Sequence, residues 1–142
     1  MKTSARNQYV GKVVAIEDGP ISSSVTVELD GGDRMYATIT HASRNELGLE
    51  TGSEAWVLVK ASWVILTPGT PGLKLSARNR LCGTVDRLTT GSVNTDVVVR
   101  LKGGNTISAI ITNESAEDLG LKEGNAVCAA FKASSVILGI QA

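Results

Sequence analysis

The chain contains few of the residue types that usually perform catalysis. Its 142 residues include one histidine, two cysteines and only five aromatic side chains, which are two Trp, two Tyr and one Phe. It also lacks the Gly-x-x-x-x-Gly-Lys-Ser/Thr loop that cradles nucleotide phosphates and the Gly-x-Ser-x-Gly turn that carries a serine nucleophile. These absences leave no candidate catalytic residue, so we do not expect an enzyme.

An excess of charge of either sign is lacking as well. The chain has 14 basic and 14 acidic side chains, and no basic tail or stripe. Nucleic-acid binders need basic surfaces and, for single strands, stacked aromatic rings. No apolar run approaches the roughly 18 residues of a membrane-spanning helix, and no apolar signal region opens the chain. We therefore expect a soluble, cytoplasmic protein with neither a nucleic acid nor a membrane as partner.

A tandem repeat organises what is present. Ser-Ala-Arg-Asn occurs at residues 4–7 and again at residues 76–79, and the same offset of 72 aligns residues 3–66 with residues 75–138 without a gap. Of the 64 aligned pairs, 26 are identical, which is too many for chance. The chain is therefore an internal duplication. We predict a first domain at residues 1–66, a linker at residues 67–74 and a second domain at residues 75–142.

The apolar pattern of each copy predicts short strands. In the first copy, alternating or short apolar runs predict strands near residues 8–16, 25–29, 35–40, 54–59 and 64–66, with the last strand closing the unit and a loop at residues 17–24. Asp30-Gly31-Gly32-Asp33 predicts a hairpin, and Gly11 predicts a bulge or a close backbone contact.

One short helix is expected between the third and fourth strands of each copy. Ser43 followed by Glu46 is typical of a capping box, and Gly48 of a left-handed helix end; Ser115 begins the second helix. This element order predicts an all-β fold of two tandem OB-like five-stranded barrels, each with one short helix. A β-sandwich is the alternative.

The cysteines and the histidine are not shared between the copies. Cys82 and Cys128 correspond to Val10 and Trp56, and His41 corresponds to Asn113. A disulfide framework or metal site common to both copies is thereby excluded, and we expect no bare metal cation. We interpret the cysteines as small buried thiols in a reducing compartment.

Only two charged residues are identical in both copies, and both are cations: Arg6, repeated as Arg78, and Lys60, repeated as Lys132. Each lies in a block of small polar residues, Ser-Ala-Arg-Asn or Lys-Ala-Ser. If these blocks meet near Thr40, they offer two cations, hydroxyl groups and backbone amides with no shared carboxylate. Such a pocket suits a small dianionic oxyanion. A structural role for the two cations, paired with carboxylates across an interface, remains the alternative.

These blocks, taken in order, resemble a known family. Ser-Ala-Arg-Asn with Gly11 four residues on, Ile39-Thr40, Leu-Gly-Leu at residues 47–49 and Lys-Ala-Ser at residues 60–62 are similar to the molybdenum-binding Mop domain of the molbindins. The second copy repeats them over nearly its whole length. The chain thus resembles a di-Mop molbindin.

The resemblance implies a function and a set of ligands. It implies a stand-alone molybdate-storing or buffering protein, with tungstate as a possible ligand, no organic cofactor and anions bound at domain and subunit interfaces of a homotrimer. The implied ligands are Ser4, Arg6, Thr40, Lys60, Ala61 and Ser62, with Ser76, Arg78, Thr112, Lys132, Ala133 and Ser134. The helix starts at Ser43 and Ser115 are candidates for an additional axial anion site. An anion-sensing regulatory module acting on a partner protein is the alternative function.

Overall fold

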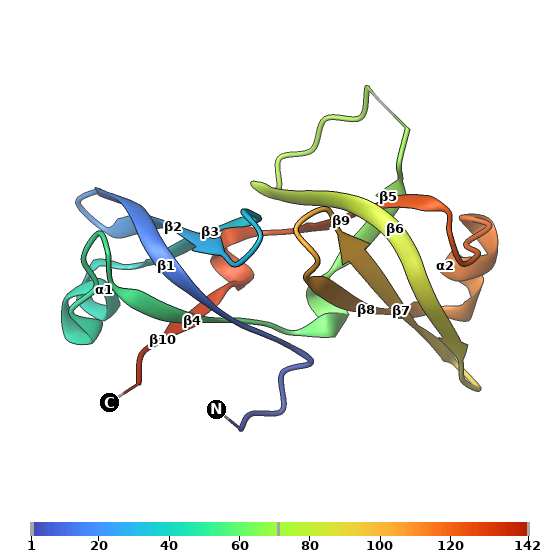
Figure 1. Ribbon diagram of the computed structural model, residues 1–142, viewed down its shortest axis with the longest axis horizontal. Helices are drawn as coiled ribbons and strands as arrows, with labels where there is room; N and C mark the ends of the chain where they lie inside the picture. The colour runs from blue at the N-terminus through green and yellow to red at the C-terminus, as the bar shows by residue number, and fades with distance from the viewer. Residues whose placement is uncertain (1, 71, 142) are drawn as a thin grey trace.

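Two curled five-stranded antiparallel sheets lie side by side along the long axis of the molecule (Figure 1). The computed structural model describes residues 2–70 and 72–141; Pro71, in the predicted linker, and the predicted domain ends at residues 1 and 142 lie outside them. The first half contains β1 (Asn7–Asp18), β2 (Ser22–Leu29), β3 (Arg34–Thr40), α1 (His41–Leu47), β4 (Glu54–Val59), the 3-10 turn η1 (Ala61–Trp63) and β5 (Ile65–Pro68). The second half contains β6 (Asn79–Thr90), β7 (Asn94–Leu101), β8 (Thr106–Thr112), α2 (Asn113–Asp118), β9 (Ala126–Phe131), η2 (Ala133–Ser135) and β10 (Ile137–Gly139). The predicted all-β fold of two tandem five-stranded units, each with one short helix, is confirmed, and the sandwich alternative is not; each sheet is curled into a half-barrel.

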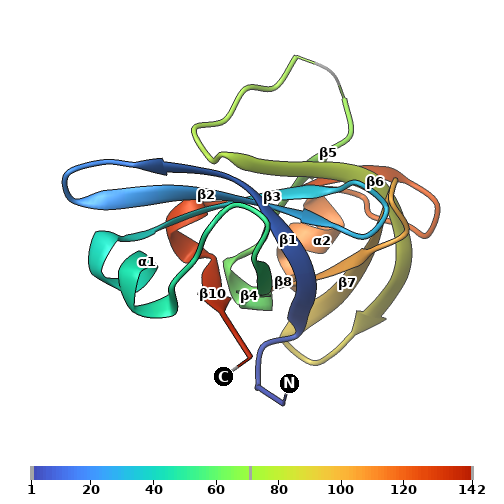
Figure 2. The ribbon, with the colours of Figure 1, turned by 60° about the vertical axis from the view of Figure 1, so that its left-hand side comes forward.

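The two halves exchange their last strands. The strand order is β10-β4-β1-β2-β3 in one sheet and β5-β9-β6-β7-β8 in the other. Ile65 of the first copy is thus opposite Ala130, and Ile137 of the second copy is opposite Leu58. Figures 1 and 2 show β5 in the second half and β10 in the first. The prediction that residues 64–66 close their own unit is wrong, because the apolar pattern of a strand does not say which sheet it joins.

The core follows the alternation in the sequence. On β2, Val25, Val27 and Leu29 are buried while Thr26 and Glu28 between them are partly exposed. Side chains on one face of a strand recur every two residues, so this face packs inward. Each buried Val or Leu contributes about 1.5–3 kcal/mol of apolar burial. Phe131 and Met35 are the largest fully buried side chains among the described residues.

Two buried asparagines clasp the halves together. Asn7 donates from Nδ2 to the carbonyl oxygen of Ser108 over 2.8 Å and accepts from its amide over 2.7 Å. Asn79 makes the same pair of bonds to Tyr36, over 2.7 and 2.8 Å. Their exposed fractions are 3% and 1%. Each asparagine thereby fixes the Ser-Ala-Arg segment before it against a strand of the opposite half.

Several element boundaries differ from those predicted. The predicted loop at residues 17–24 shrinks because β1 extends to Asp18 and β2 begins at Ser22. Gly11 does make the expected close contact, since a Cβ there would lie 2.6 Å from the Glu28 carbonyl oxygen, whereas the bulge lies further on, between Val13 and Ala15. The predicted linker is shorter at its start, because residues 67 and 68 belong to β5.

The predicted capping box is wrong in its register. Thr40, not Ser43, is the N-cap of α1: its backbone is extended and its Oγ1 accepts from the Ser43 amide over 3.0 Å. Thr112 caps α2 in the same way through the Ser115 amide, over 3.1 Å. A threonine at the end of a strand can serve the following helix, so the first hydroxyl before the helix becomes the cap. The predicted left-handed glycine at position 48 is confirmed, with φ of 62°.

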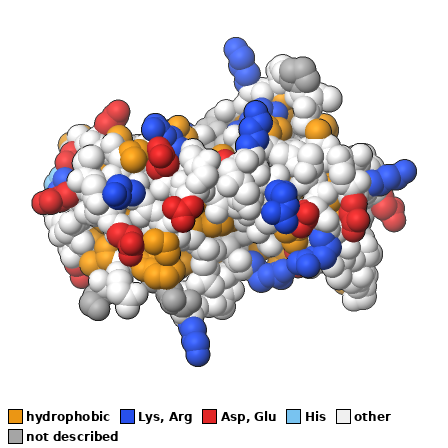
Figure 3. Space-filling view, viewed as in Figure 1, with side chains coloured by type: hydrophobic (Ala, Val, Ile, Leu, Met, Phe, Trp, Pro, Cys, Tyr) orange, Lys and Arg blue, Asp and Glu red, His pale blue; other side chains and the backbone are white. Residues whose placement is uncertain are grey.

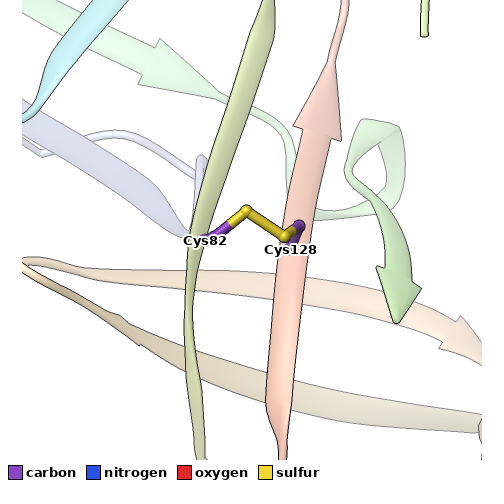
Figure 4. Close-up of a disulfide and its surroundings, with 2 residues drawn as sticks. All are labelled: Cys82 and Cys128. Atoms are coloured by element: carbon purple, nitrogen blue, oxygen red, sulfur yellow. A yellow bond between two sulfur atoms is a disulfide. The ribbon is translucent and has the colours of Figure 1, made fainter. Parts of the chain in front are cut away.

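The two cysteines form a disulfide, which corrects the prediction of separate buried thiols. Cys82 of β6 and Cys128 of β9 are directly opposite each other on neighbouring strands (Figure 4). Only Cys128 is buried, and Cys82 is exposed. The residues are 46 positions apart, so the register that joins them arises only when β6 pairs with β9. The inference of a reducing compartment, which depended on unlinked thiols, loses that support.

Candidate functional site

The two cationic blocks of each copy meet at one end of a strand pair. Asn7 is opposite Val59 in the β1–β4 ladder, so Arg6 and Lys60 leave the sheet side by side. Asn79 is likewise opposite Phe131 in the β6–β9 ladder, which brings Arg78 beside Lys132. Strand register therefore brings the Ser-Ala-Arg-Asn and Lys-Ala-Ser blocks of each copy together, which is one part of the meeting near Thr40 that the sequence predicts.

A hollow of about 550 Å³ gathers the blocks of the second copy. Its polar lining consists of Thr38, Ser76, Arg78, Lys132 and Ser134, with the Ala133 segment beside them. Its apolar wall is made by Ile65, Leu75, Ala77 and Ala130. Thr38 comes from the first half, because η2 packs against β3. No carboxylate belongs to this lining, so two cations face the hollow without a neutralising acid.

Arg78 is held in place by residues of the first half. Its Nη1 donates to the Ser24 hydroxyl over 2.6 Å, and its guanidinium lies 5.0 Å from the centre of the Tyr36 ring. Ser24 is opposite Thr38 in the β2–β3 ladder, so the two hydroxyl-bearing residues are neighbours. A guanidinium fixed in this way presents its remaining N–H groups in a defined direction, which favours binding of an oxyanion.

The corresponding place in the first copy has different neighbours. Arg6 forms an ion pair with Asp96, which occupies the position equivalent to Ser24. Lys60 lies 5.7 Å from the centre of the Trp63 ring. The equivalent of Thr38 is Ile110, directly opposite Asp96 in the β7–β8 ladder. The structural alternative raised by the sequence, a cation paired with a carboxylate of the opposite half, thus applies to Arg6 and not to Arg78.

Arg6 also lines a second hollow, of about 330 Å³, which is mainly polar. Its other lining residues are Asn7, Gln8, Tyr9, Gly104, Asn105, Thr106 and Ser108. The Tyr9 hydroxyl donates to the Thr106 carbonyl oxygen over 2.7 Å. Burial, and secondarily the negative charge of Asp33, raise the pKa of Tyr9 well above its ordinary value. Tyr9 is therefore a neutral donor that ties β1 to β8.

The threonines and helix starts lie apart from the arginines. Thr112 and Ser115 line a hollow of about 590 Å³ with Ser62, which belongs to the Lys-Ala-Ser block of the first copy. Thr40 and Thr112 each donate from their hydroxyl to the Oγ of the serine three residues on, over 2.8 Å. Thr38, rather than Thr40, lines the hollow that contains Arg78. Ser4, Thr40, Ser43, Lys60 and Ala61 line none of the hollows described here.

Sequence reasoning missed four residues around the arginines: Ser24, Tyr36, Thr38 and Asp96. Thr38 does not stand out when the two copies are compared, because its counterpart is Ile110. The alternation of side chains along β3 could have identified Thr38, because Thr38 and Thr40 share a face of the strand. The other three had no signal, because each contacts an arginine of the opposite half, 42 to 90 residues away.

The described residues, 2–70 and 72–141, contain neither an arrangement typical of a metal site nor a membrane-spanning helix. In this part of the chain no group of three or more His, Cys, Asp or Glu side chains is placed to hold a metal ion. The same residues include no helix long and apolar enough to cross a membrane.

The architecture defines a class: a duplicated small β-domain protein whose halves meet at cationic, hydroxyl-rich segments. The family comparison agrees with this description. The TOBE domain family matches residues 3–66 and again residues 75–138, and the chain belongs to this family, as a tandem pair of its domains.

Relatives resemble the chain along nearly its whole length. The molybdenum transport protein ModE of Herbaspirillum seropedicae is 43% identical over 141 residues, which cover 99% of this chain and 52% of that protein. The molybdenum-pterin-binding protein MopA of Rhodobacter capsulatus is 41% identical over 140 residues, which cover 99% and 53%. The chain thus spans about half the length of these curated relatives.

One solved structure matches this chain over nearly the full length of both proteins. The cytoplasmic molybdate-binding protein ModG, in a crystal form grown from PEG with molybdate bound, superposes with a TM-score of 0.94 and 44% identity. The match covers 99% of this chain and 100% of that one. Both the half-barrel fold and the pairing of the halves therefore have a counterpart in an experimental structure.

Proposed function

We propose that this protein reversibly binds molybdate, and tungstate as its close chemical analogue, for storage and buffering of molybdenum, without catalysing a reaction. The observation that carries the proposal is the likeness to ModG, a molybdate-binding protein of the same fold with molybdate bound. The hollow around Arg78 and Lys132 supplies the matching chemistry, because two cations and surrounding hydroxyl groups suit a tetrahedral dianion.

The proposed ligands remain the repeated blocks and the threonines. In the second copy, charge-assisted hydrogen bonds from Arg78 and Lys132 provide most of the affinity, and Ser76, Ser134 and the Ala133 amide complete the shell. The first copy offers Ser4, Arg6, Lys60, Ala61 and Ser62 in the equivalent places. Thr40 and Thr112 serve as ligands only where another half or subunit brings them to a cationic block.

Such a meeting across subunits is part of the proposal. Ile65 and Ile137, equivalent in the two copies, are 61% and 52% exposed, and Trp63 is 45% exposed. Apolar side chains this exposed at repeated positions favour burial against further copies of the chain. We propose a cytoplasmic homotrimer whose repeated units, residues 1–66 and 75–142, are joined by the segment between them and place anions at domain and subunit interfaces. The Ser43 and Ser115 helix starts stay candidates for an axial site only.

The proposal is tested by native mass spectrometry and isothermal titration with molybdate, beside an equal concentration of sulfate. We expect a trimer that gains several molybdates and is not blocked by sulfate. The double variant Arg6→Ala/Arg78→Ala should lose at least about 100-fold in affinity, because each guanidinium contributes charged hydrogen bonds. Arg34→Ala, which removes an exposed arginine paired with Glu28, is the matched control. Unchanged molybdate capacity in the double variant would reject the site.

The alternative function is an anion-sensing module that acts on a partner protein. It is motivated by the regulators among the relatives, such as the DNA-binding transcriptional dual regulator ModE of Escherichia coli, 34% identical over 139 residues that make up 52% of that protein. A pull-down with and without molybdate separates the two functions. A partner retained only in the presence of the anion favours the sensor.

A further inference from the structure

We infer that the two cationic sites of one chain are unequal, and that Asp96 makes the Arg6 site the weaker one for a dianionic oxyanion. The inference rests on the proposed function and assigns a specificity-determining role to a residue outside the repeated blocks. It follows from comparing two equivalent pairs of cross-strand neighbours, Ser24 with Thr38 and Asp96 with Ile110.

The two pairs occupy the same place relative to an arginine of the opposite half. Arg78 donates to the Ser24 hydroxyl, and Thr38 lines the same hollow. Arg6 pairs with the Asp96 carboxylate, and Ile110 stands at the position of Thr38. The first site therefore gains one negative charge and loses two hydroxyl groups relative to the second. Both differences disfavour an anion.

In the absence of a ligand, the ion pair with Asp96 also engages the guanidinium of Arg6. Arg6 donates from Nη2 to Asp96 Oδ2, so one N–H of the guanidinium is already engaged with an anion before any ligand arrives. The Asp96 side chain is 26% exposed, and a neighbouring acid that is partly withdrawn from water is poorly screened. An incoming dianion must either displace the carboxylate from Arg6 or lie close to it.

The second carboxylate oxygen points to the same conclusion. Asp96 Oδ1 is buried and has no hydrogen-bond partner among the described residues. It can accept a hydrogen bond but cannot donate one while ionised. A fully deprotonated oxyanion near Arg6 therefore meets an acceptor where the Arg78 site offers the hydroxyl donors of Ser24 and Thr38. The structure thus assigns tight binding to the Arg78 site and weak binding to the Arg6 site.

The consequence is a two-stage uptake. The Arg78 sites fill at low molybdate, and the Arg6 sites fill only when the anion is more abundant. A single chain then buffers over a wider concentration range than two identical sites would.

Isothermal titration with molybdate tests this on the whole chain. The wild-type protein should show two affinity classes. Asp96→Ser, which copies the second half, should tighten the weak class about tenfold by removing a nearby negative charge. The reciprocal change Ser24→Asp should weaken the tight class by about the same factor. Asp86→Ser removes an exposed carboxylate paired with Arg100 and is the matched charge control; it should move neither class.

Crystals of the wild-type protein equilibrated with substoichiometric molybdate give a second readout that needs no variant. Anomalous scattering from molybdenum should be stronger at Arg78 than at Arg6. Equal occupancies, a single affinity class, or an Asp96→Ser protein whose weak class is unchanged would overturn the inference while leaving molybdate binding intact. Absence of molybdate uptake by the wild-type protein would instead reject the proposed function, and this inference with it.

Discussion

The two halves are joined by a pair of identical asparagine clasps but surround their arginines with different contacts. Asn7 and Asn79 make the same two hydrogen bonds to the backbone of the opposite half. One residue earlier, Arg6 meets an aspartate and Arg78 meets a serine. The asparagine clasps form part of the interface between the halves, and each half contributes one of them. The neighbours of the arginines affect the proposed anion affinity of each site and not the docking of the halves, so they are free to differ.

The exposed surface shows the same freedom to diverge. Basic and acidic side chains both occur on each half of the visible face (Figure 3). The pairs at equivalent positions often carry opposite signs, as with Glu28 and Arg100. Throughout the molecule, the two halves therefore share their backbone geometry and differ in their charged side chains. The following experiments compare a change in one half with the equivalent position in the other.

Removing the asparagine clasps should have the largest effect. Asn7→Ala or Asn79→Ala leaves one buried backbone amide and one buried carbonyl unpaired, which costs about 2–4 kcal/mol each time. The double variant should lose about 4–8 kcal/mol, enough to unfold a domain of ordinary stability. The two single variants should lose similar amounts, because each removes the same pair of hydrogen bonds to the backbone of the opposite half. Guanidinium denaturation at a fixed protein concentration measures this.

Asn45→Ala, on the exposed face of α1, is the control and should change the free energy of unfolding by less than about 0.5 kcal/mol. A loss below about 1 kcal/mol in Asn7→Ala would contradict the claim that the clasp is buried and fully bonded.

Opening the disulfide should affect one half only. Cys82 and Cys128 enclose a loop with a sequence separation of 46, and closing a loop of this length stabilises a fold by about 2–4 kcal/mol. The equivalent positions, Val10 and Trp56, are directly opposite each other without a covalent bond. Reduction, or the variant Cys82→Ala/Cys128→Ala, should therefore speed amide hydrogen exchange in β6 and β9 and leave β1 and β4 protected.

Thiol titration of the unreduced, unfolded protein checks the premise of this experiment. Two free thiols there would show that the pair is not oxidised in the isolated protein. Faster exchange throughout both halves would show instead that the halves unfold as one unit.

Most of the fold was predictable because the repeat and the strand pattern carry it. The strand at residues 54–59 was predicted with the boundaries that β4 has, and the glycine hairpins and left-handed Gly48 followed from backbone freedom. The exchange of β5 and β10 was not predictable, because either sheet would bury the same apolar residues. The disulfide depends on the register of β6 against β9, which the spacing of the cysteines does not contain.

The candidate site was predictable only where the two copies agree. Arg6, Lys60 and their counterparts stood out because they are identical among charges that diverged. Comparing copies discards every position that differs, and for this reason Asp96 and Ser24 escaped notice. Their contacts with Arg6 and Arg78 cross between the halves, over sequence separations of 90 and 54 residues. Such contacts arise from the docking of the halves, not from any local pattern.

Tyr9 accounts for the smallest expected difference in stability between the two halves, because its counterpart is Leu81, which has no hydroxyl group. Tyr9→Leu or Tyr9→Phe should cost about 1–1.5 kcal/mol at pH 7 through loss of the hydrogen bond to Thr106. The pKa of Tyr9 is raised by burial and by Asp33, so the folded state disfavours the phenolate. The stability linked to this group is therefore complete below the unfolded pKa of about 10 and is lost as pH rises above it. The gap in free energy of unfolding between wild type and Tyr9→Phe should shrink between about pH 9 and pH 11, and a gap that stayed constant over this range would show that the Tyr9 hydroxyl ionises as readily in the folded chain as in the unfolded one.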